Sequence, residues 1–239
     1  MPQKIHSLLI FICVIVLSCK EDKQITFTET NITTENNSIV EINVPKAKGS
    51  ETLANNINSE IENTIKDLIQ FSELSAEALS VEEAINNFNK EFEGFKTDFP
   101  DLQISWEAQI DGEVVYQSEE IISLAITSYI FTGGAHGMSN VSFLNFNAEN
   151  GQVLSNEQLI NDVDGFKQLA QSYFNQTIVE KEHSIFDTDE FVLPYNMAYT
   201  EDGLVLLYNT YEIAPYSTGI IEFKIPFEEA APFLVFNHF

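Results

Sequence analysis

A glycine-rich bend around one histidine is the stretch in which side chains are best placed for chemistry. Gly133 and Gly134 shortly precede His136 in residues 132–137 (TGGAHG). A histidine in such a bend could act as a general base, because imidazole titrates near neutral pH. No partner for this base can be identified by spacing, and no Gly-Lys-Ser/Thr follows to make a phosphate loop. Since glycine adopts positive φ without steric cost, we interpret Thr132, Gly133, Gly134 and His136 as a structural turn or a partner-binding loop.

Three tyrosines near the C-terminus form a second candidate binding group. Tyr208, Tyr211 and Tyr216 fall within residues 208–219 (YNTYEIAPYSTG), with Pro215 before the last of them. Tyrosine is enriched at recognition surfaces, so an exposed aromatic patch is one interpretation. A tyrosine-rich sheet corner with satisfied hydroxyls explains the pattern equally well.

The remaining ionisable residues give no specific signal for metal or acid–base chemistry. His183 and His238 are isolated and lack metal-ligand spacing, and residues 187–190 (DTDE) lack the EF-hand pattern. Carboxylate pairs could be drawn from 37 acidic residues almost at will. We therefore predict no metal, no cofactor and no catalytic residue, and expect that the protein is not an enzyme.

The first nineteen residues predict a lipid attachment site. Lys4 precedes ten unbroken apolar residues, 8–17 (LLIFICVIVL), a length typical of a signal-peptide core rather than a membrane span. Residues 16–19 (VLSC) then form a bacterial lipobox, with cleavage between Ser18 and Cys19 and a diacylglyceryl group on the Cys19 thiol. The alternatives are an ordinary signal peptide with a chance cysteine, or an uncleaved anchor.

The residues after Cys19 suggest where in the cell envelope the protein is located. Lys20, Glu21 and Asp22 resemble the signal that sends lipoproteins of Bacteroidetes to the outer face of the outer membrane, although an acidic tether explains them equally well. We expect a lipid anchor in the outer membrane, with the protein surface-exposed or facing the periplasm. Cys13 would leave with the signal peptide, so no disulfide can form in the mature chain.

The charge of the chain limits its partners. The 37 acidic residues outnumber 11 basic ones, all of them lysine, for a formal net charge of −26. Such a chain is a poor ligand for nucleic acid, and a cationic protein is a more suitable partner. Solubility at a crowded surface would also account for the charge.

The hydrophobic pattern predicts an α+β fold with mainly antiparallel sheets and helices packed on one face. The expected helices are 50–69, 80–99 with a capping box at Ser80, and 161–180 with a cap at Asp162 or Asp164. The expected strands are 38–44, 102–110, 113–117, 121–131, 139–146, 191–199, 204–209 and 219–225, with Asp111-Gly112 as a hairpin turn.

No Pro/Gly/Ser-rich linker divides the mature chain, and we expect two small subdomains. The predicted divisions are 1–18, a lipoprotein signal peptide; 19–37, a flexible acidic tether with one short strand near residues 25–28; 38–131, an N-terminal α+β subdomain; and 132–239, a C-terminal α+β subdomain.

Two motifs resemble a known family. Residues 129–137 (YIFTGGAHG) resemble its YTGGAH signature, and residues 208–219 resemble its later Y-x-IAPYAxG segment. Residues 146–151, followed by Leu154 and Leu159, fit its bridge of strand, turn and helix. The chain over about residues 39–233 thus resembles the paired extracytoplasmic domains of unknown function found in the peptidoglycan deacetylase PdaC and the anti-sigma factor RsiV.

The resemblance implies an α+β module of the cell envelope. In the anti-sigma factor this ectodomain binds lysozyme, and in the deacetylase it accompanies a separate catalytic domain. Here we expect no sigma-binding segment, no later membrane-spanning helix and no deacetylase domain. The preferred hypothesis is a non-enzymatic module that binds a protein, such as lysozyme, or a peptidoglycan-related ligand. The alternatives are an accessory or catalytic enzyme acting on peptidoglycan, with His136 near its site, and a scaffold subunit of an envelope complex.

Overall fold

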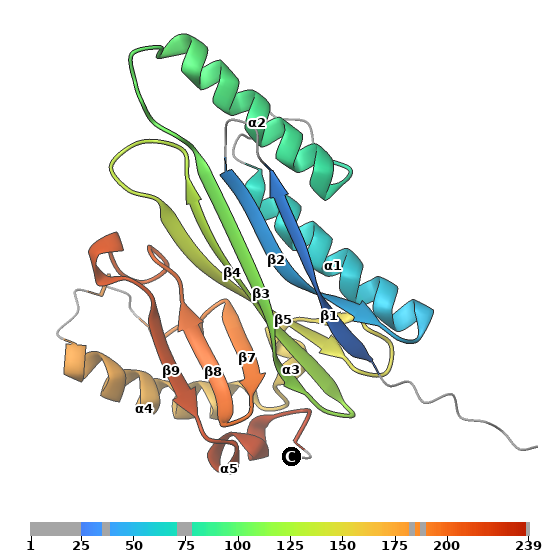
Figure 1. The fold of residues 1–239 in the computed structure, drawn as a ribbon. Coiled ribbons are helices and arrows are strands. Elements are labelled where there is room, and N and C mark those ends of the chain that lie inside the picture. The colour runs from blue at the N-terminus through green and yellow to red at the C-terminus, as the bar shows by residue number, and fades with distance from the viewer. Residues whose placement is uncertain (1–24, 35–38, 71–77, 182–184, 187–189, 238–239) are drawn as a thin grey trace, which may run out of the picture.

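The computed structural model describes residues 25–34, 39–70, 78–181, 185–186 and 190–237 (Figure 1). The predicted signal peptide, Ser18, Cys19, His183 and His238 lie outside these residues, as does most of the acidic stretch 187–190. They stay predictions.

The described residues form nine strands, five α-helices and two short 3-10 helices. The strands are β1 (Thr26–Thr34), β2 (Ile39–Lys48), β3 (Glu107–Gln117), β4 (Ile121–Phe131), β5 (Met138–Asn147), β6 (Val153–Leu154), β7 (Asn196–Thr200), β8 (Gly203–Tyr208) and β9 (Ile221–Ile225). The helices are α1 (Glu51–Ile69), α2 (Val81–Asp98), α3 (Asn156–Leu159), α4 (Val163–Lys181), α5 (Phe227–Ala230), η1 (Tyr216–Thr218) and η2 (Ala231–Phe233).

The predicted α+β class is confirmed. A six-stranded sheet has the order β1-β2-β3-β4-β5-β6, and a three-stranded sheet has the order β7-β8-β9. Every pair is antiparallel except β2 and β3, between which the chain runs through α1 and α2. These two helices lie on one side of the large sheet, and the small sheet lies on its other side (Figure 1).

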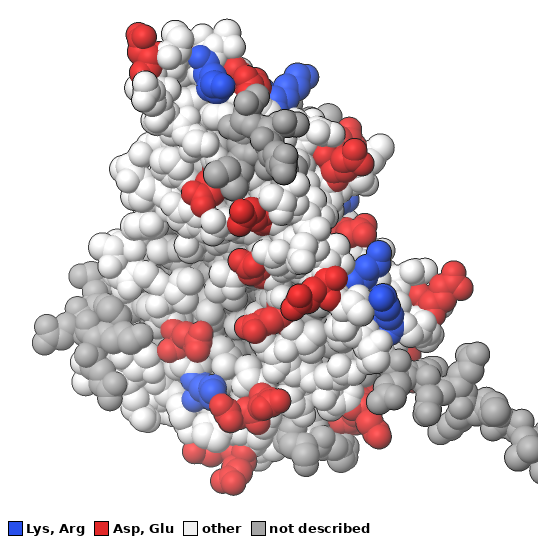
Figure 2. Space-filling view, in the orientation of Figure 1, with Lys and Arg blue, Asp and Glu red and all other residues white. Residues whose placement is uncertain are grey.

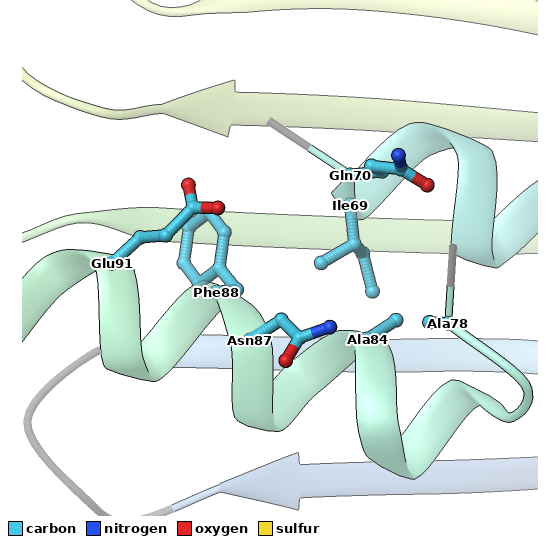
Figure 3. Close-up of a pocket in the computed structure, with 7 residues that line it drawn as sticks. All are labelled: Ile69, Gln70, Ala78, Ala84, Asn87, Phe88 and Glu91. Atoms are coloured by element: carbon cyan, nitrogen blue, oxygen red, sulfur yellow. The ribbon is translucent and has the colours of Figure 1, made fainter. Parts of the chain in front are cut away.

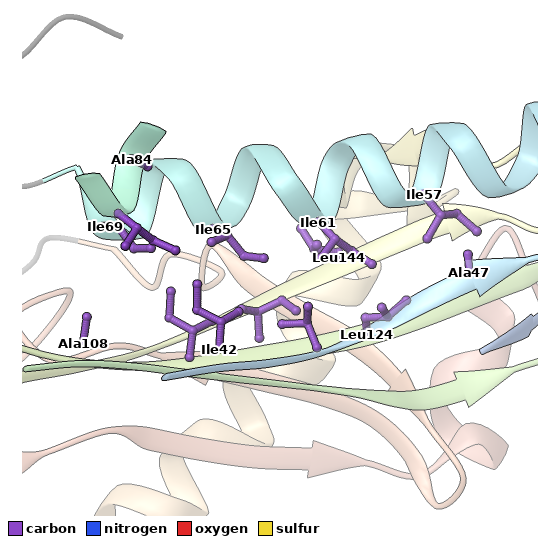
Figure 4. Close-up of a cluster of buried hydrophobic side chains, with 14 of the residues drawn as sticks. Ile42, Ala47, Ile57, Ile61, Ile65, Ile69, Ala84, Ala108, Leu124 and Leu144 are labelled. Carbon is purple, nitrogen blue, oxygen red and sulfur yellow. The ribbon is translucent and has the colours of Figure 1, made fainter. Parts of the chain in front are cut away.

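An isoleucine stripe attaches α1 to the large sheet. Ile57, Ile61, Ile65 and Ile69 recur every four residues, so they share one face of the helix. All four are at most 3% exposed and point toward the strands (Figure 4). The predicted helix and its core face are therefore confirmed.

The start of α2 forms one half of its predicted capping box, and the other half is shifted by one residue. The Ser80 hydroxyl accepts a hydrogen bond from the Glu83 N–H, and the Glu83 carboxylate accepts one from the Leu79 N–H. The first bond satisfies an amide that the helix start leaves open, and the second holds the residue before the N-cap. Further along α2, Phe88 and Phe92 pack on Trp106, with ring centroids 5.3 and 5.7 Å away.

The predicted hairpin at Asp111-Gly112 is wrong, because β3 runs through both residues. A Cβ on Gly112 would lie 2.8 Å from Cδ of Pro45 and 2.9 Å from Cδ1 of Ile126. This glycine therefore permits a close approach of neighbouring strands and does not form a turn. The Asp111 carboxylate accepts a hydrogen bond from the Asn43 amide of β2.

The large sheet extends beyond the residues predicted for the N-terminal subdomain. The short strand predicted near residues 25–28 of the tether is present and is longer than predicted: residues 26–34 form β1, with Phe27 and Ile32 packed on the core beneath α1. At the other end, β5 and β6 add residues up to Leu154 to the same sheet. The domain division at residue 132 stays a prediction.

The small sheet packs on α4. Asp162 caps this helix, as one of the two predicted residues, by accepting a hydrogen bond from the Gly165 N–H. Phe166, Ala170 and Phe174 of α4 join strand residues in a second core that includes Ile121 of β4. The small sheet is therefore joined to the large one through shared apolar packing.

Asn196 of β7 and Asn209, directly after β8, form hydrogen bonds with backbone groups along the edge of β5. Asn209 accepts from the Val141 N–H and donates to the Val141 carbonyl, at 2.9 and 2.8 Å. Asn196 accepts from the Phe143 N–H. Unpaired strand edges are costly or prone to association, so these amides stabilise both the edge and the contact between the sheets.

None of the described helices is both long and apolar enough to cross a membrane.

Candidate functional site

The structure brings three of the predicted binding residues together. The His136 ring stacks on Tyr216, with centroids 3.7 Å apart and planes 17° apart, and Tyr211 lies 5.8 Å from Tyr216. His136 follows β4, whereas both tyrosines follow β8, so the group joins the two sheets. We call His136, Tyr211 and Tyr216, with Tyr129 beside them, the aromatic cluster.

The Gly137 backbone is at the centre of the aromatic cluster. Its carbonyl accepts a hydrogen bond from the Tyr216 hydroxyl at 2.9 Å, and it lies 3.0 Å from Nδ1 of His136. When Nδ1 carries the proton, His136 donates to the same oxygen. A Cβ on Gly137 would lie about 2.5 Å from the Tyr129 ring, so this ring packs directly on the glycine backbone.

Gly133 and Gly134 have φ values of 91° and 107°, as the interpretation of a turn expects. A Cβ on Gly133 would lie 3.7 Å from Phe95 and 3.9 Å from Nε1 of Trp106. Gly134 is exposed and faces open space, and Thr132 is half-buried. These residues therefore shape the bend that carries His136.

Tyr211 has an unfavourable backbone and an exposed side chain. Its φ is 69°, and it is the one described residue other than glycine with positive φ. This conformation costs roughly 1–2 kcal/mol in a residue with a side chain. Its side chain is 51% exposed, so local packing alone does not account for a tyrosine here.

Tyr208 is not part of the aromatic cluster. It is buried in the small sheet, and its hydroxyl donates to the Val192 carbonyl at 2.6 Å. Burial, followed by the nearby charge of Glu212, raises the pKa of Tyr208 above the ordinary tyrosine value. For this residue the sequence-based alternative of a satisfied sheet tyrosine is the better description.

The side of the large sheet opposite α1 and α2 carries, beside the small sheet, a group of acids that sequence reasoning missed. In β3 the side chains alternate, with Ala108 and Ile110 buried toward the helices. The opposite parity places acids on the face away from α1 and α2, and the register with β2 adds one more. We call these residues the acidic face: Glu41, Glu107, Asp111 and Glu113.

Within the part of the chain that the structure describes, the carboxylates of the acidic face have no cationic partner. None of the four forms an ion pair with a lysine of the described residues. Figure 2 shows acidic side chains outnumbering basic ones over the side of the molecule seen in Figure 1. Tyr129 pairs with Gln109 across β3 and β4, so the acidic face adjoins the aromatic cluster.

The cavity between the end of α1 and α2 is too small for a ligand. Ile69, Ala84 and Phe88 border it together with Asn87 and Glu91 (Figure 3), and its volume is about 10 Å³. That volume accommodates about one water molecule. Among the described residues, no group of three or more His, Cys, Asp or Glu is arranged to hold a metal ion.

Two protein-family models match the chain, one after the other. The family described as deacetylase PdaC matches residues 32–139, and the family described as a protein of unknown function, DUF3298, matches residues 149–228. The resemblance inferred from the two motifs is confirmed. The chain is thus similar to a PdaC domain over residues 32–139 and, directly after it, to a DUF3298 domain over residues 149–228.

Two solved structures share the fold. A DUF3298 family protein from Pseudomonas aeruginosa PAO1 is 19% identical, with a TM-score of 0.64, over 90% of this chain and 95% of that chain. A DUF3298 family member from Bacteroides fragilis is 22% identical, with a TM-score of 0.61, over 90% of this chain and 94% of that chain. No curated protein matches the sequence.

Proposed function

We propose that this protein is a non-enzymatic binding module of the bacterial envelope and that its partner is a cationic protein such as lysozyme. The observation that carries the proposal is the acidic face beside the aromatic cluster. Together they offer charge for attraction and aromatic rings for close contact on one side of the molecule.

The acidic face suits a basic partner because its charges point into solvent from a rigid sheet. Glu41, Asp111 and Glu113 are exposed and share one side of paired strands. Like charges held together repel one another and attract lysine- or arginine-rich surfaces. A basic partner would relieve this repulsion when it binds.

The aromatic cluster would supply short-range contacts. Tyr211 presents a half-exposed ring, while Tyr216 is held by its hydrogen bond to Gly137 and by its stack on His136. Rings that are already ordered lose little entropy on binding, and tyrosine is frequent among the residues that dominate interface energy. The unfavourable φ of Tyr211 fits a residue kept for contact rather than for stability.

Titration calorimetry of the purified chain with hen lysozyme tests the specific version of this proposal. We expect association at physiological salt that weakens on the order of tenfold at several-fold higher salt, since exposed charges are screened. Tyr211→Ala should weaken binding further without lowering the unfolding midpoint. An absence of heat and of salt-dependent association would exclude lysozyme as the partner.

We also propose that the module is anchored through lipid on Cys19, in the outer membrane and either surface-exposed or facing the periplasm. The lipobox ending in Cys19 supports the anchor, and Lys20-Glu21-Asp22 supports the surface address. Mass spectrometry of detergent extracts should show a lipid-sized increase on Cys19 that is lost in Cys19→Ala. An unmodified cysteine in extracts from the native host would refute the anchor.

A second candidate function is action on peptidoglycan, which the exposed His136 beside Tyr216 favours. In this version the Nδ1 contact with Gly137 would orient the imidazole, leaving Nε2 to accept a proton. Turnover of purified peptidoglycan that disappears in His136→Ala would support it. No turnover by the unaltered protein would leave binding as the function.

A further inference from the structure

A second cavity is lined by none of the residues of the acidic face or the aromatic cluster. It has a volume of about 370 Å³ and lies between α4, residues 191–195 and the end of β8. We infer that this α4 pocket binds a small molecule with an apolar, ring-sized body and a cationic or neutral hydrogen-bond donor. Its size is in the range of known small-molecule sites.

The floor of the α4 pocket is aromatic. Phe174 and Tyr208 are 7% and 2% exposed and meet edge to face, with centroids 5.5 Å apart. Phe191 packs on Phe174 from the side at 5.3 Å. This rigid apolar floor favours a flat or branched hydrocarbon group, which loses its contact with water on entry.

One carboxylate sets the polarity of the α4 pocket. Glu212 lines it, and its two oxygens accept hydrogen bonds from the Tyr195 and Asn209 N–H groups, both at 2.9 Å. A carboxylate accepts about four hydrogen bonds, so a fixed Glu212 can still accept from a ligand. Because the Tyr208 hydroxyl already donates its proton to the Val192 carbonyl, it does not donate a hydrogen bond to a ligand.

The charge around the α4 pocket excludes anionic ligands. No lysine is among the described lining residues, and the chain carries a net charge of −26. An anionic ligand would meet Glu212 without a compensating cation, whereas an amine would pair with it. The side-chain amides of Gln171 and Asn175 supply further polar contacts.

The α4 pocket is open to solvent. Val192 and Tyr195 line it, and their side chains are 60% and 83% exposed. Large apolar groups left exposed beside an aromatic cavity are typical of binding grooves. A ligand in this pocket would cover part of these groups.

Ligand-observed NMR with the purified full chain tests the inference using three probes of similar shape. They are 2-phenylethylamine, 2-phenylethanol and 3-phenylpropanoate, at the millimolar concentrations suited to such small molecules. We expect the amine to bind best, the alcohol more weakly and the acid least. No binding by any of them, or binding of the acid as strong as that of the amine, would overturn the inference.

Neighbouring positions on α4 provide a matched pair of variants. Asn175 lines the pocket, whereas Gln176 does not, and both are exposed. Asn175→Trp should reduce amine binding at least about tenfold, because the indole fills the mouth, while Gln176→Trp should not. Glu212→Gln should remove the preference for the amine over the alcohol. Equal binding by both tryptophan variants would place the probe elsewhere and overturn the inference.

Discussion

Gly137 and Tyr129 are in direct contact, and this contact fixes the bend that carries His136. Gly137→Ala should lower the free energy of unfolding by about 1–3 kcal/mol, because the new methyl group would overlap the Tyr129 ring. Gly94→Ala is the control, since a methyl there meets nothing within 4 Å and alanine favours a helix. Urea denaturation should therefore give shifts of opposite sign. A neutral Gly137→Ala would contradict this description of the bend.

The raised pKa of Tyr208 predicts that the folded protein loses stability in alkali. Its folded-state pKa is raised by burial, so above the ordinary tyrosine pKa of about 10 the unfolded chain loses a proton that the folded protein keeps. Stability is therefore fully present below about pH 10 and falls as pH rises beyond it. Tyr208→Phe should flatten this fall, measured as unfolding free energy against pH, whereas the exposed-site control Tyr195→Phe should not. An unchanged slope in Tyr208→Phe would contradict the prediction.

The sequence motifs predicted part of the candidate site. The motif pattern singled out His136, Tyr211 and Tyr216, which the fold brings together, and also Tyr208, which it buries elsewhere. Spacing alone could not separate them, because three of these residues lie within nine positions of one another. Tyr129 could not be assigned to the group, since its role depends on contact with Gly137 across a turn.

At the scale of elements, the contact between the two sheets depends on few side chains. Asn209→Ala removes both hydrogen bonds to the Val141 backbone and leaves that strand edge unpaired. We expect a loss of about 2 kcal/mol in the free energy of unfolding, at about 1 kcal/mol for each bond. Chemical denaturation measures it, with the exposed Asn31→Ala on β1 as the control. Equal effects of the two changes would show that Asn209 does not hold the sheets together.

Local signals predicted helices better than sheet connections. Ser80 and Asp162 cap their helices as expected, because capping depends on residues within one turn. Asp111-Gly112 misled the prediction, because a glycine needed for close strand packing looks the same in sequence as one needed for a turn. The extent of β1 and the parallel pairing of β2 with β3 depend on contacts between distant residues.

At the scale of the whole molecule, composition gave the sign of the charge but not its location. The net charge of −26 suggested a cationic partner, and solubility explained it equally well. The register of β2 with β3 places Glu41 beside the acids of β3 on a face that α1 and α2 do not cover. This arrangement supports the proposed binding surface, because overall solubility does not require acids to gather on one face.

The most direct test of the proposed function compares charge removal on opposite faces of the large sheet. Glu41→Gln with Asp111→Asn changes the acidic face, whereas Glu62→Gln with Asp67→Asn removes the same charge from the exposed side of α1. Both pairs remove two negative charges, so only the location of the change differs.

The quantity to measure is the dissociation constant for hen lysozyme of each double variant and of the unaltered chain. The acidic-face pair should weaken binding by about tenfold, and the α1 pair by about twofold or less. Equal losses would mean that overall charge, rather than this face, attracts the partner and would contradict the proposed binding surface.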